Sequence, residues 1–553
     1  AAGIGNQSFT MLGHGGFRSL GDHSGNITVL ATDGVSFAAT PSTNLGVNGD
    51  QAFAQLGHGG FDSGFETRSL LAEGGGATSG TNFHLNTPEG TAEGTSGDIV
   101  VLAGVDALGA VTNAAASIEF TTGADTDAYA QLGHGGKNTN GAHNGLIEVA
   151  AGNAISFDAS NALKVPAGGN PNANGAYVQL GHGGQAADAR EAAANGYDGA
   201  ITVSAGLGGA GGITFLAGGQ NDNYAQLGHG GRNARGDHSG DISVDSADTM
   251  VFTGGDDLRS YAQIGHGGHD ADDTSTAIGN TGAIMINVNP LFTQNANANL
   301  LFTAGNGEES YAQIGHGGFG TAGNHSSTDF EISASGDLIL RSGNGTGFGN
   351  DGGDAANKGF RSYSQIGHGG YNAAGTNGGD LCVHIGGSIT MDSADGGSFN
   401  TNGFTQIGHG GRNVDGNHSG NLVVVAGRQT QGDITMTAGN AGRQFVQVGH
   451  GGDESSGNLA GRVFVVADNG GNLTMTGGGA DGSYVMSGHG DGRGTYGNFG
   501  SGNTSGSRQG GIQYFVDGAA TLDTGSAANT NVHLLHRTIN GGGLSYPGSY
   551  LGG

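Results

Sequence analysis

The sequence predicts an all-β protein, a parallel β-solenoid with three strands per turn and about 11–12 turns of roughly 37–52 residues. Three observations support this class. A short motif, YAQLGHGG at 224–231, recurs along the chain with small changes. Each copy is followed by two apolar runs that alternate with period two, whereas amphipathic runs of period 3.6 are not found. Glycine accounts for 121 of 553 residues, as many tight turns would require.

The Gly-His-Gly centre of the motif marks the repeats. Its eleven histidines are His14, His58, His134, His182, His229, His266, His316, His368, His409, His450 and His489. They are spaced 44, 76, 48, 47, 37, 50, 52, 41, 41 and 39 residues apart. Eleven blades would exceed the roughly 4–8 of a propeller, so one coil turn per copy is the better interpretation. Right-handed winding is the default for parallel strands.

Each turn is expected to hold three strands. In the copy around His229 they are 224–228, 241–246 and 249–254, and the next copy starts at Tyr261. Residues 1–525 are predicted to form one solenoid, with a loop excursion at 61–97 that explains the spacing of 76 residues. Residues 526–553 are predicted to contain a degenerate last strand, TNVHLLHRTI, and a C-terminal arm or linker.

The first strand of each turn has two different faces. Its Leu or Ile column is expected to point into the core, which leaves the Tyr/Phe and Gln columns facing outward or lining a second buried surface. Facing outward, the tyrosines would form an apolar stripe typical of interaction surfaces: Tyr129, Tyr177, Tyr224, Tyr261, Tyr311 and Tyr363. The glutamines are expected to satisfy one another in a ladder: Gln131, Gln179, Gln226, Gln263, Gln313 and Gln365. A phenylalanine ladder in strand three, which passes to methionine near the C-terminus, is expected to be plain core.

The histidine column has three interpretations: a structural corner, a metal-binding column and a catalytic site. Five copies carry another histidine nine residues on, at His23, His143, His238, His325 and His418. By register, Tyr197, Asn280, Asn377 and Leu459 take this place in other copies, and a ligand would not tolerate such replacements. Charging a closely spaced column also costs repulsion. The structural corner is therefore favoured, with neutral, hydrogen-bonded rings near pH 7 and no metal.

Composition excludes several classes of function. The formal charge is −29 with 18 basic residues and no basic patch, so nucleic acid is not expected as a partner. No segment approaches the ~20 apolar residues of a membrane span.

The chain has a single cysteine, Cys382, within an apolar run, and we expect its side chain to lie in the core.

Acidic residues are scattered through variable loops. Examples are Asp256, Asp257, Asp270, Asp272, Asp273, Glu308 and Glu309. We expect them to be solvated, with Ca²⁺ binding as the alternative and no other cofactor. Polysaccharide cleavage needs clustered carboxylates, so an enzyme is not expected.

Strand pairs such as GDISVDSADTMVFTGG and GNLVVVAGRQTQGDITMTAGN resemble those of bacterial secreted β-helical exoproteins, the filamentous-haemagglutinin-like and autotransporter-passenger adhesins. The resemblance covers roughly residues 8–525 and is one of repeat style. It implies an extracellular or cell-surface location and an adhesive or scaffolding role.

Open strand edges at the ends of a solenoid favour self-association. We therefore expect a structural extracellular protein, the subunit of a filament or sheath whose partner is a second copy stacked head to tail. The alternative is a monomeric adhesin segment that binds glycan or another cell surface through its loops and aromatic stripe. A polysaccharide-active enzyme is the third candidate.

Overall fold

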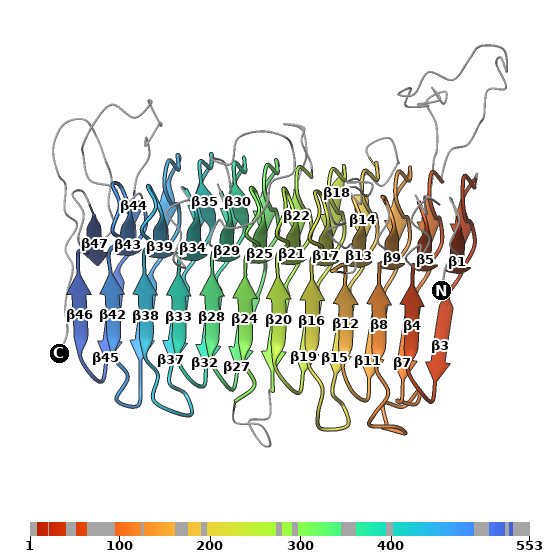
Figure 1. Ribbon diagram of the computed structural model, residues 1–553, viewed down its shortest axis with the longest axis horizontal. Helices are drawn as coiled ribbons and strands as arrows, with labels where there is room; N and C mark the ends of the chain where they lie inside the picture. The colour runs from red at the N-terminus through yellow and green to blue at the C-terminus, as the bar shows by residue number, and fades with distance from the viewer. Residues whose placement is uncertain are drawn as a thin grey trace, which may run out of the picture.

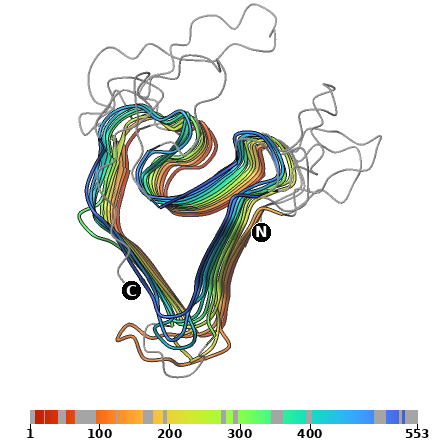
Figure 2. The same cartoon turned by 90° about the vertical axis from the view of Figure 1, so that its left-hand side faces the viewer.

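The computed structural model describes thirteen segments of the chain: 8–19, 21–39, 51–63, 94–122, 126–160, 175–189, 196–271, 279–289, 297–343, 361–393, 402–490, 508–525 and 530–534. Every regular element in these segments is a β-strand, and none of the segments contains a helix long and apolar enough to cross a membrane. The strands stack into a long rod that runs from the first turn to the last (Figure 1). Viewed along the rod, successive turns superpose on a triangular outline with one side folded inward (Figure 2).

The strands form four long parallel sheets, which we number by their order within a turn. Sheet 1 has 12 strands: β1 (Phe9–Leu12), β5 (Phe53–Leu56), β9 (Tyr129–Leu132), β13 (Tyr177–Leu180), β17 (Tyr224–Leu227), β21 (Tyr261–Ile264), β25 (Tyr311–Ile314), β29 (Tyr363–Ile366), β34 (Phe404–Ile407), β39 (Phe445–Val448), β43 (Tyr484–Ser487) and β47 (Asn531–Leu534).

The chain then enters a narrow sheet of very short strands, the corner sheet. Its 11 strands are β2 (His23–Ser24), β6 (Thr95–Ser96), β10 (His143–Asn144), β14 (Gly196–Asp198), β18 (Asp237–Ser239), β22 (Asn280–Thr281), β26 (His325–Ser326), β31 (Asn377–Gly378), β36 (His418–Ser419), β40 (Leu459–Ala460) and β44 (Arg508–Gln509).

Sheets 2 and 3 complete each turn. The 11 strands of sheet 2 are β3 (Ile27–Ala31), β7 (Ile99–Ala103), β11 (Ile147–Ala151), β15 (Ile201–Ala205), β19 (Ile242–Ser246), β23 (Ile284–Val288), β27 (Phe330–Ala334), β32 (Leu381–Ile385), β37 (Leu422–Ala426), β41 (Val463–Ala467) and β45 (Ile512–Val516). The 11 strands of sheet 3 are β4 (Val35–Ala38), β8 (Ile118–Thr121), β12 (Ile155–Asp158), β16 (Ile213–Leu216), β20 (Met250–Thr253), β24 (Leu300–Thr303), β28 (Leu338–Arg341), β33 (Ile389–Asp392), β38 (Ile434–Thr437), β42 (Leu473–Thr476) and β46 (Ala520–Asp523). A fifth, two-stranded sheet pairs β30 (Gly369–Tyr371) with β35 (Gly410–Arg412).

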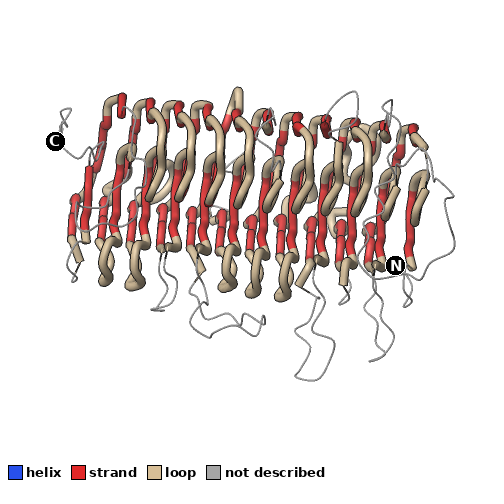
Figure 3. Tube along the Cα trace, turned by 90° about the horizontal axis from the view of Figure 1, so that it is seen from above, coloured by secondary structure: helices blue, strands red, loops and turns tan. Residues whose placement is uncertain are grey.

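The parallel β-solenoid predicted from the sequence is confirmed. Strands of successive turns lie side by side along the rod (Figure 3), and equivalent residues pair, with Tyr177 opposite Tyr224 and Gln179 opposite Gln226. The expected count of three strands per turn omits the corner sheet. Its strands have only two or three residues, which is too short to show a period in the sequence. Most of the expected excursion at 61–97 lies outside the described residues, as do 526–529 and 535–553.

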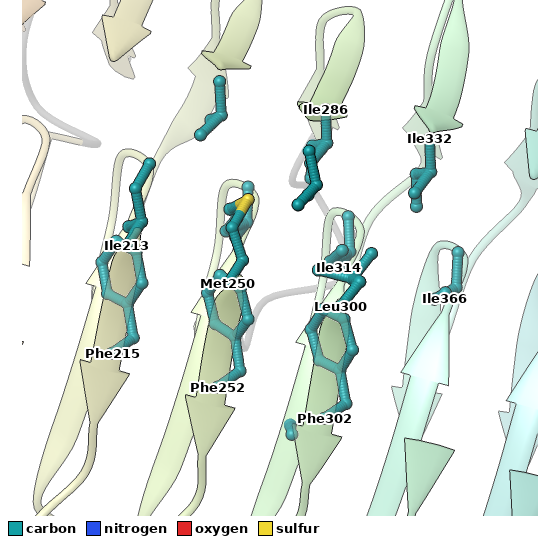
Figure 4. Packing of buried hydrophobic residues seen from close by; sticks show 14 of the residues in the cluster. Ile213, Phe215, Met250, Phe252, Ile286, Leu300, Phe302, Ile314, Ile332 and Ile366 are labelled. Carbon is teal, nitrogen blue, oxygen red and sulfur yellow. The ribbon is translucent and has the colours of Figure 1, made fainter. Parts of the chain in front are cut away.

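One apolar core runs the whole length of the rod. Alternate residues of sheets 1, 2 and 3 point into it, including the Leu and Ile column of sheet 1. The phenylalanines of sheet 3 stack in register, with ring centroids 5.0 Å apart between Phe215 and Phe252 and 4.8 Å apart between Phe252 and Phe302 (Figure 4). The strand-three ladder is therefore core, as expected.

A second core covers the other face of sheet 1. The six tyrosines of the expected stripe are fully buried, so the exposed apolar stripe is wrong and the second buried surface is correct. Their rings stack 4.7–4.9 Å apart. The segment after each Gly-His-Gly-Gly folds back over this face, where Phe61, Phe319 and Tyr371 pack against the stack. This segment is polar and aperiodic in most turns, so the sequence did not reveal the cover.

Cys382 is also placed differently from the expectation. It lies in β32 between the inward residues Leu381 and Val383, so its side chain points outward and is half-buried. Partial burial raises the pKa of its thiol.

The close approach of successive turns predicts a strong effect of one added methyl group. A Cβ on Gly181 would lie 2.0 Å from the carbonyl oxygen of Gly228, and the residue has a φ of +151°. We expect Gly181→Ala to cost at least the roughly 1–3 kcal/mol of a strained backbone. Gly219→Ala is the control, because nothing lies within 4 Å of its Cβ position. Denaturant unfolding followed by circular dichroism should separate the two variants, and equal midpoints would contradict the prediction.

Candidate functional site

The Gly-His-Gly corner ends each strand of sheet 1. Its glycines have conformations that other residues rarely adopt, for example φ +148° at Gly133 and +99° at Gly135. A Cβ on Gly133 would lie 1.9 Å from the carbonyl oxygen of Gly181 in the next turn. Glycine is thus required because the backbones of neighbouring corners almost touch.

The eleven corner histidines form one continuous column. Neighbouring rings stack with centroids 4.6–5.0 Å apart. The backbone N–H of each histidine donates to Nδ1 of the histidine one turn later, over 2.9–3.1 Å in all ten pairs. Each ring therefore caps the corner of the turn before it.

The other ring nitrogen holds a second corner of the preceding turn. Nε2 of His134 lies 2.7 Å from the carbonyl oxygen of Gly97, which stands between the corner sheet and sheet 2. Eight further corner histidines make the same contact with an equivalent glycine, over 2.7–3.0 Å. His368 instead meets Oγ of Ser327 at 2.9 Å. Each imidazole thus fastens the end of sheet 1 to the start of sheet 2.

These partners fix the protonation state of the column. A backbone N–H can only donate, so Nδ1 accepts, and a carbonyl can only accept, so Nε2 carries the hydrogen. Burial lowers the pKa of His182 to about 3 and those of His266 and His409 to about 4. Both nitrogens of these rings are used by the backbone, which leaves no lone pair for a metal.

The second histidine column lies in the corner sheet. The structure pairs His143 with Tyr197, His238 with Asn280 and His418 with Leu459, and it places Asn377 beside His325. The rings of His143 and Tyr197 stack at 5.2 Å, and Nδ1 of His143 lies within hydrogen-bond distance of Oγ1 of Thr95, at 2.9 Å. Except for the half-buried His23, these residues are buried. The mixed column is a packing layer between the corners.

The glutamine ladder is built differently from the expectation. Nε2 of Gln131 donates to the carbonyl oxygens of Gly181 and Gly183 in the next turn, at 3.2 and 2.9 Å. Its Oε1 accepts the hydroxyl of Tyr177 at 3.4 Å. The other five predicted glutamines donate to the equivalent pair of glycine carbonyls, each in the turn that follows it: Gln179, Gln226, Gln263, Gln313 and Gln365. The prediction that stacked amides satisfy one another is wrong, because the positive φ values turn glycine carbonyls toward them.

Two glutamines lack the tyrosine partner. Gln365 and Gln406 are followed one turn later by Phe404 and Phe445, which have no hydroxyl. Accordingly, Oε1 of Gln365 and Oε1 of Gln406 are buried without a hydrogen-bond donor. Among the described glutamines of sheet 1, these two have an amide oxygen without a hydrogen-bond donor.

Sequence reasoning missed a column of buried charge beside the second core. The residue after Gly-His-Gly-Gly is buried in most described turns, whether it is apolar or charged, as at Lys137, Arg412 and Asp453, and it is half-buried at Phe17 and Arg232. Lys137 pairs with Asp127, and Arg412 lies 2.6 Å from Asp453. A sequence signal existed, since oppositely charged residues occur ten apart across the motif at 127 and 137, 222 and 232, and 443 and 453.

The acidic residues singled out in the loops mostly have structural partners. Asp270 and Glu309 face opposite ring nitrogens of His269 at 3.1 and 3.5 Å, and Asp256 accepts from Asn306 at 2.8 Å. Asp272 and Asp273 lie outside the described residues. Within the described segments, no group of three or more His, Cys, Asp or Glu side chains is arranged to hold a metal. Ca²⁺ binding remains an untested expectation.

Comparisons with family models, curated proteins and solved structures found no match to this chain.

The histidine column predicts a loss of stability in acid. The unfolded chain binds protons near the ordinary histidine pKa of 6.5, whereas folded His182 and His266 bind them only near 3 and 4. The free energy of unfolding should therefore fall as pH drops below 6.5, by about 1.4 kcal/mol per pH unit for each such histidine, until the folded values are reached. Urea midpoints measured from pH 8 to pH 4.5 test this. A midpoint that is unchanged or rises toward pH 5 would contradict it.

The two unsatisfied glutamines predict a stabilising substitution. Phe404→Tyr and Phe445→Tyr would supply the missing hydroxyls, and the glycines that make room for a tyrosine hydroxyl are retained at Gly411 and Gly452. We expect each substitution to add about 1 kcal/mol to the free energy of unfolding. The control is Phe53→Tyr, because the preceding turn has Met11 in place of glutamine. Denaturant unfolding should rank Phe404→Tyr above the wild type and Phe53→Tyr at or below it; the reverse order would refute the interpretation.

Proposed function

We propose that the protein is a structural subunit that assembles end to end into an extracellular filament or sheath. The observation that carries this proposal is that, within the residues the structure describes, the core is only partly covered in the first and last turns. In the first turn Ile27, Val29 and Phe37 are only partly buried, and in the last turns so are Ile512 and Tyr514, whereas the same columns are fully buried between them.

The two open ends have matching chemistry. Sheet 2 begins with an inward Ile27, Val29 and Ala31 and ends with an inward Ile512, Tyr514 and Val516. Stacking one copy on another would place apolar residues on apolar residues and pair the free edges of β3 and β45. Because all turns are parallel and related by translation, such a contact is head to tail and repeats without closing, which favours a filament.

The ends also expose large apolar side chains. Phe9, Leu12 and Leu30 are 45%, 46% and 57% exposed in the first turn, and Phe515 and Leu522 are 60% and 50% exposed in the last. Covering these groups would be favourable at roughly 25 cal/mol per Å² of apolar surface. An extracellular location remains part of the proposal and is motivated by the resemblance to secreted β-helical proteins.

The adhesin alternative loses its main support, since the tyrosines that were to form its aromatic stripe are buried. The loop carboxylates Asp256, Asp270 and Glu309 do not favour a polysaccharide-active enzyme, because they contact asparagine or histidine side chains rather than one another. End-to-end assembly is therefore the function that the geometry supports best.

Two adjacent residues of the first turn test the proposal. Val29 points into the open core, whereas Thr28 points outward and is exposed. We expect the wild-type protein to form filaments as its concentration rises, Val29→Lys to abolish them by placing a charge in the junction, and Thr28→Lys to leave them intact. Electron microscopy and sedimentation velocity supply the measurement. Monodisperse short rods of the wild type at high concentration would refute the proposal.

A further inference from the structure

The described coil begins and ends in the same sheet. It starts with β1 and finishes with β47, both in sheet 1, so that sheet 1 has 12 strands while the corner sheet, sheet 2 and sheet 3 have 11 each. A junction that continues all four sheets has room for one sheet 1 strand between β46 of one copy and β2 of the next. β47 and β1 of the incoming copy therefore compete for one place.

We propose that β1 of a second copy replaces β47 on the edge of β43, and that β47 occupies this edge only in the unassembled subunit. This inference rests on the proposed end-to-end assembly and names the surface and the partner: the free edge of β43 and the first strand of another copy of this chain. β47 is thus an internal plug that competes with assembly.

The side chains favour β1 over β47 at this edge. Along sheet 1 the aromatic column ends in Phe445 and Tyr484, whose rings stack at 5.1 Å, and β47 then places Asn531 on Tyr484. β1 would place Phe9 there, whose ring already stacks at 4.9 Å on Phe53 and is 45% exposed. Replacement restores an aromatic column through the junction.

The Gly-His-Gly corner that follows β1 carries polar groups that fit the end of another copy. His14 is exposed, and its ring stacks on His58 without a hydrogen bond at either ring nitrogen. It borders a hollow of about 350 Å³ that Leu12, Gly25 and Ile27 also line. In every later corner from His58 to His489, Nδ1 accepts the N–H of the preceding histidine, and Nε2 meets a glycine carbonyl or, at His368, a serine hydroxyl.

In the junction the equivalent backbone groups belong to the other copy. The position that donates to Nδ1 of His14 is the N–H of His489, one corner beyond His450 in the column. The position that accepts from Nε2 is the carbonyl of Gly510, which follows Gly461 in the glycine column. β1 thus places a phenylalanine ring on Tyr484, whereas β47 places Asn531 there.

Cross-linking distinguishes the two arrangements. Thr10 of β1 and Val532 of β47 occupy the same inward column, next after Val485 of β43. Adjacent strands lie about 4.8 Å apart, within the Cα separation of a disulfide. In a Cys382→Ser background, we expect the pair Thr10→Cys and Val485→Cys to give ladders of disulfide-linked subunits under oxidation. The matched pair Thr10→Cys and Val532→Cys should give none.

Each outcome decides between the proposals. Ladders from the Val532→Cys pair alone would show that β1 docks on β47, and would overturn the replacement while leaving end-to-end assembly in place. Filaments without cross-links from either pair would also overturn it. If neither pair cross-links and the unmodified chain forms no filaments, the proposed function itself fails.

A second test weakens β47 itself. Val532→Pro removes a backbone N–H that β47 uses in the sheet, so it should lower the concentration needed for assembly about tenfold, and Val532→Ile should not.

Discussion

Every turn of this protein lies one strand spacing from a copy of itself, and this constraint governs the choice of each repeated residue. Apolar side chains meet it by stacking, as the phenylalanines of sheet 3 do at 4.8–5.3 Å. Polar side chains must find their partners one turn away or remain unsatisfied. The corner histidine does so with both ring nitrogens, since it binds the backbone of the preceding turn at two separate corners.

The result is a buried polar lattice rather than a set of independent ladders. Histidine accepts from the preceding corner, glutamine donates to the following corner, and tyrosine donates to the preceding glutamine. Glycine makes this lattice possible because only its backbone turns the corner carbonyls toward the glutamines at such close approach. A buried network of this kind stabilises a structure only when its members are satisfied, so Gln365 and Gln406 mark where it is incomplete.

The same constraint explains why the ends of the rod differ from its middle. An interior turn is covered on both sides by turns of like sequence. Among the described residues, the first and last turns instead have a partly covered core and sheet edges, and the His14 ring contacts His58 alone. The surface that best covers such an end is another turn of the same kind. This argument links the fold to the proposed assembly, and the extra strand in sheet 1 suggests how assembly could be restrained.

The sequence alone determined the parallel solenoid, the inward Leu, Ile and Phe columns and the neutral corner histidine, because repetition and a period of two are local properties of the chain. Tertiary structure alone decided the burial of the tyrosines, the partners of the glutamines and the corner sheet. A period of two separates the faces of a strand but does not say what covers the outer face, and here the cover is an aperiodic segment. The hydrogen-bond partners of the glutamine amides depend on the directions of the glycine carbonyls. Those directions are set by backbone φ angles such as the +151° of Gly181, which the sequence does not specify.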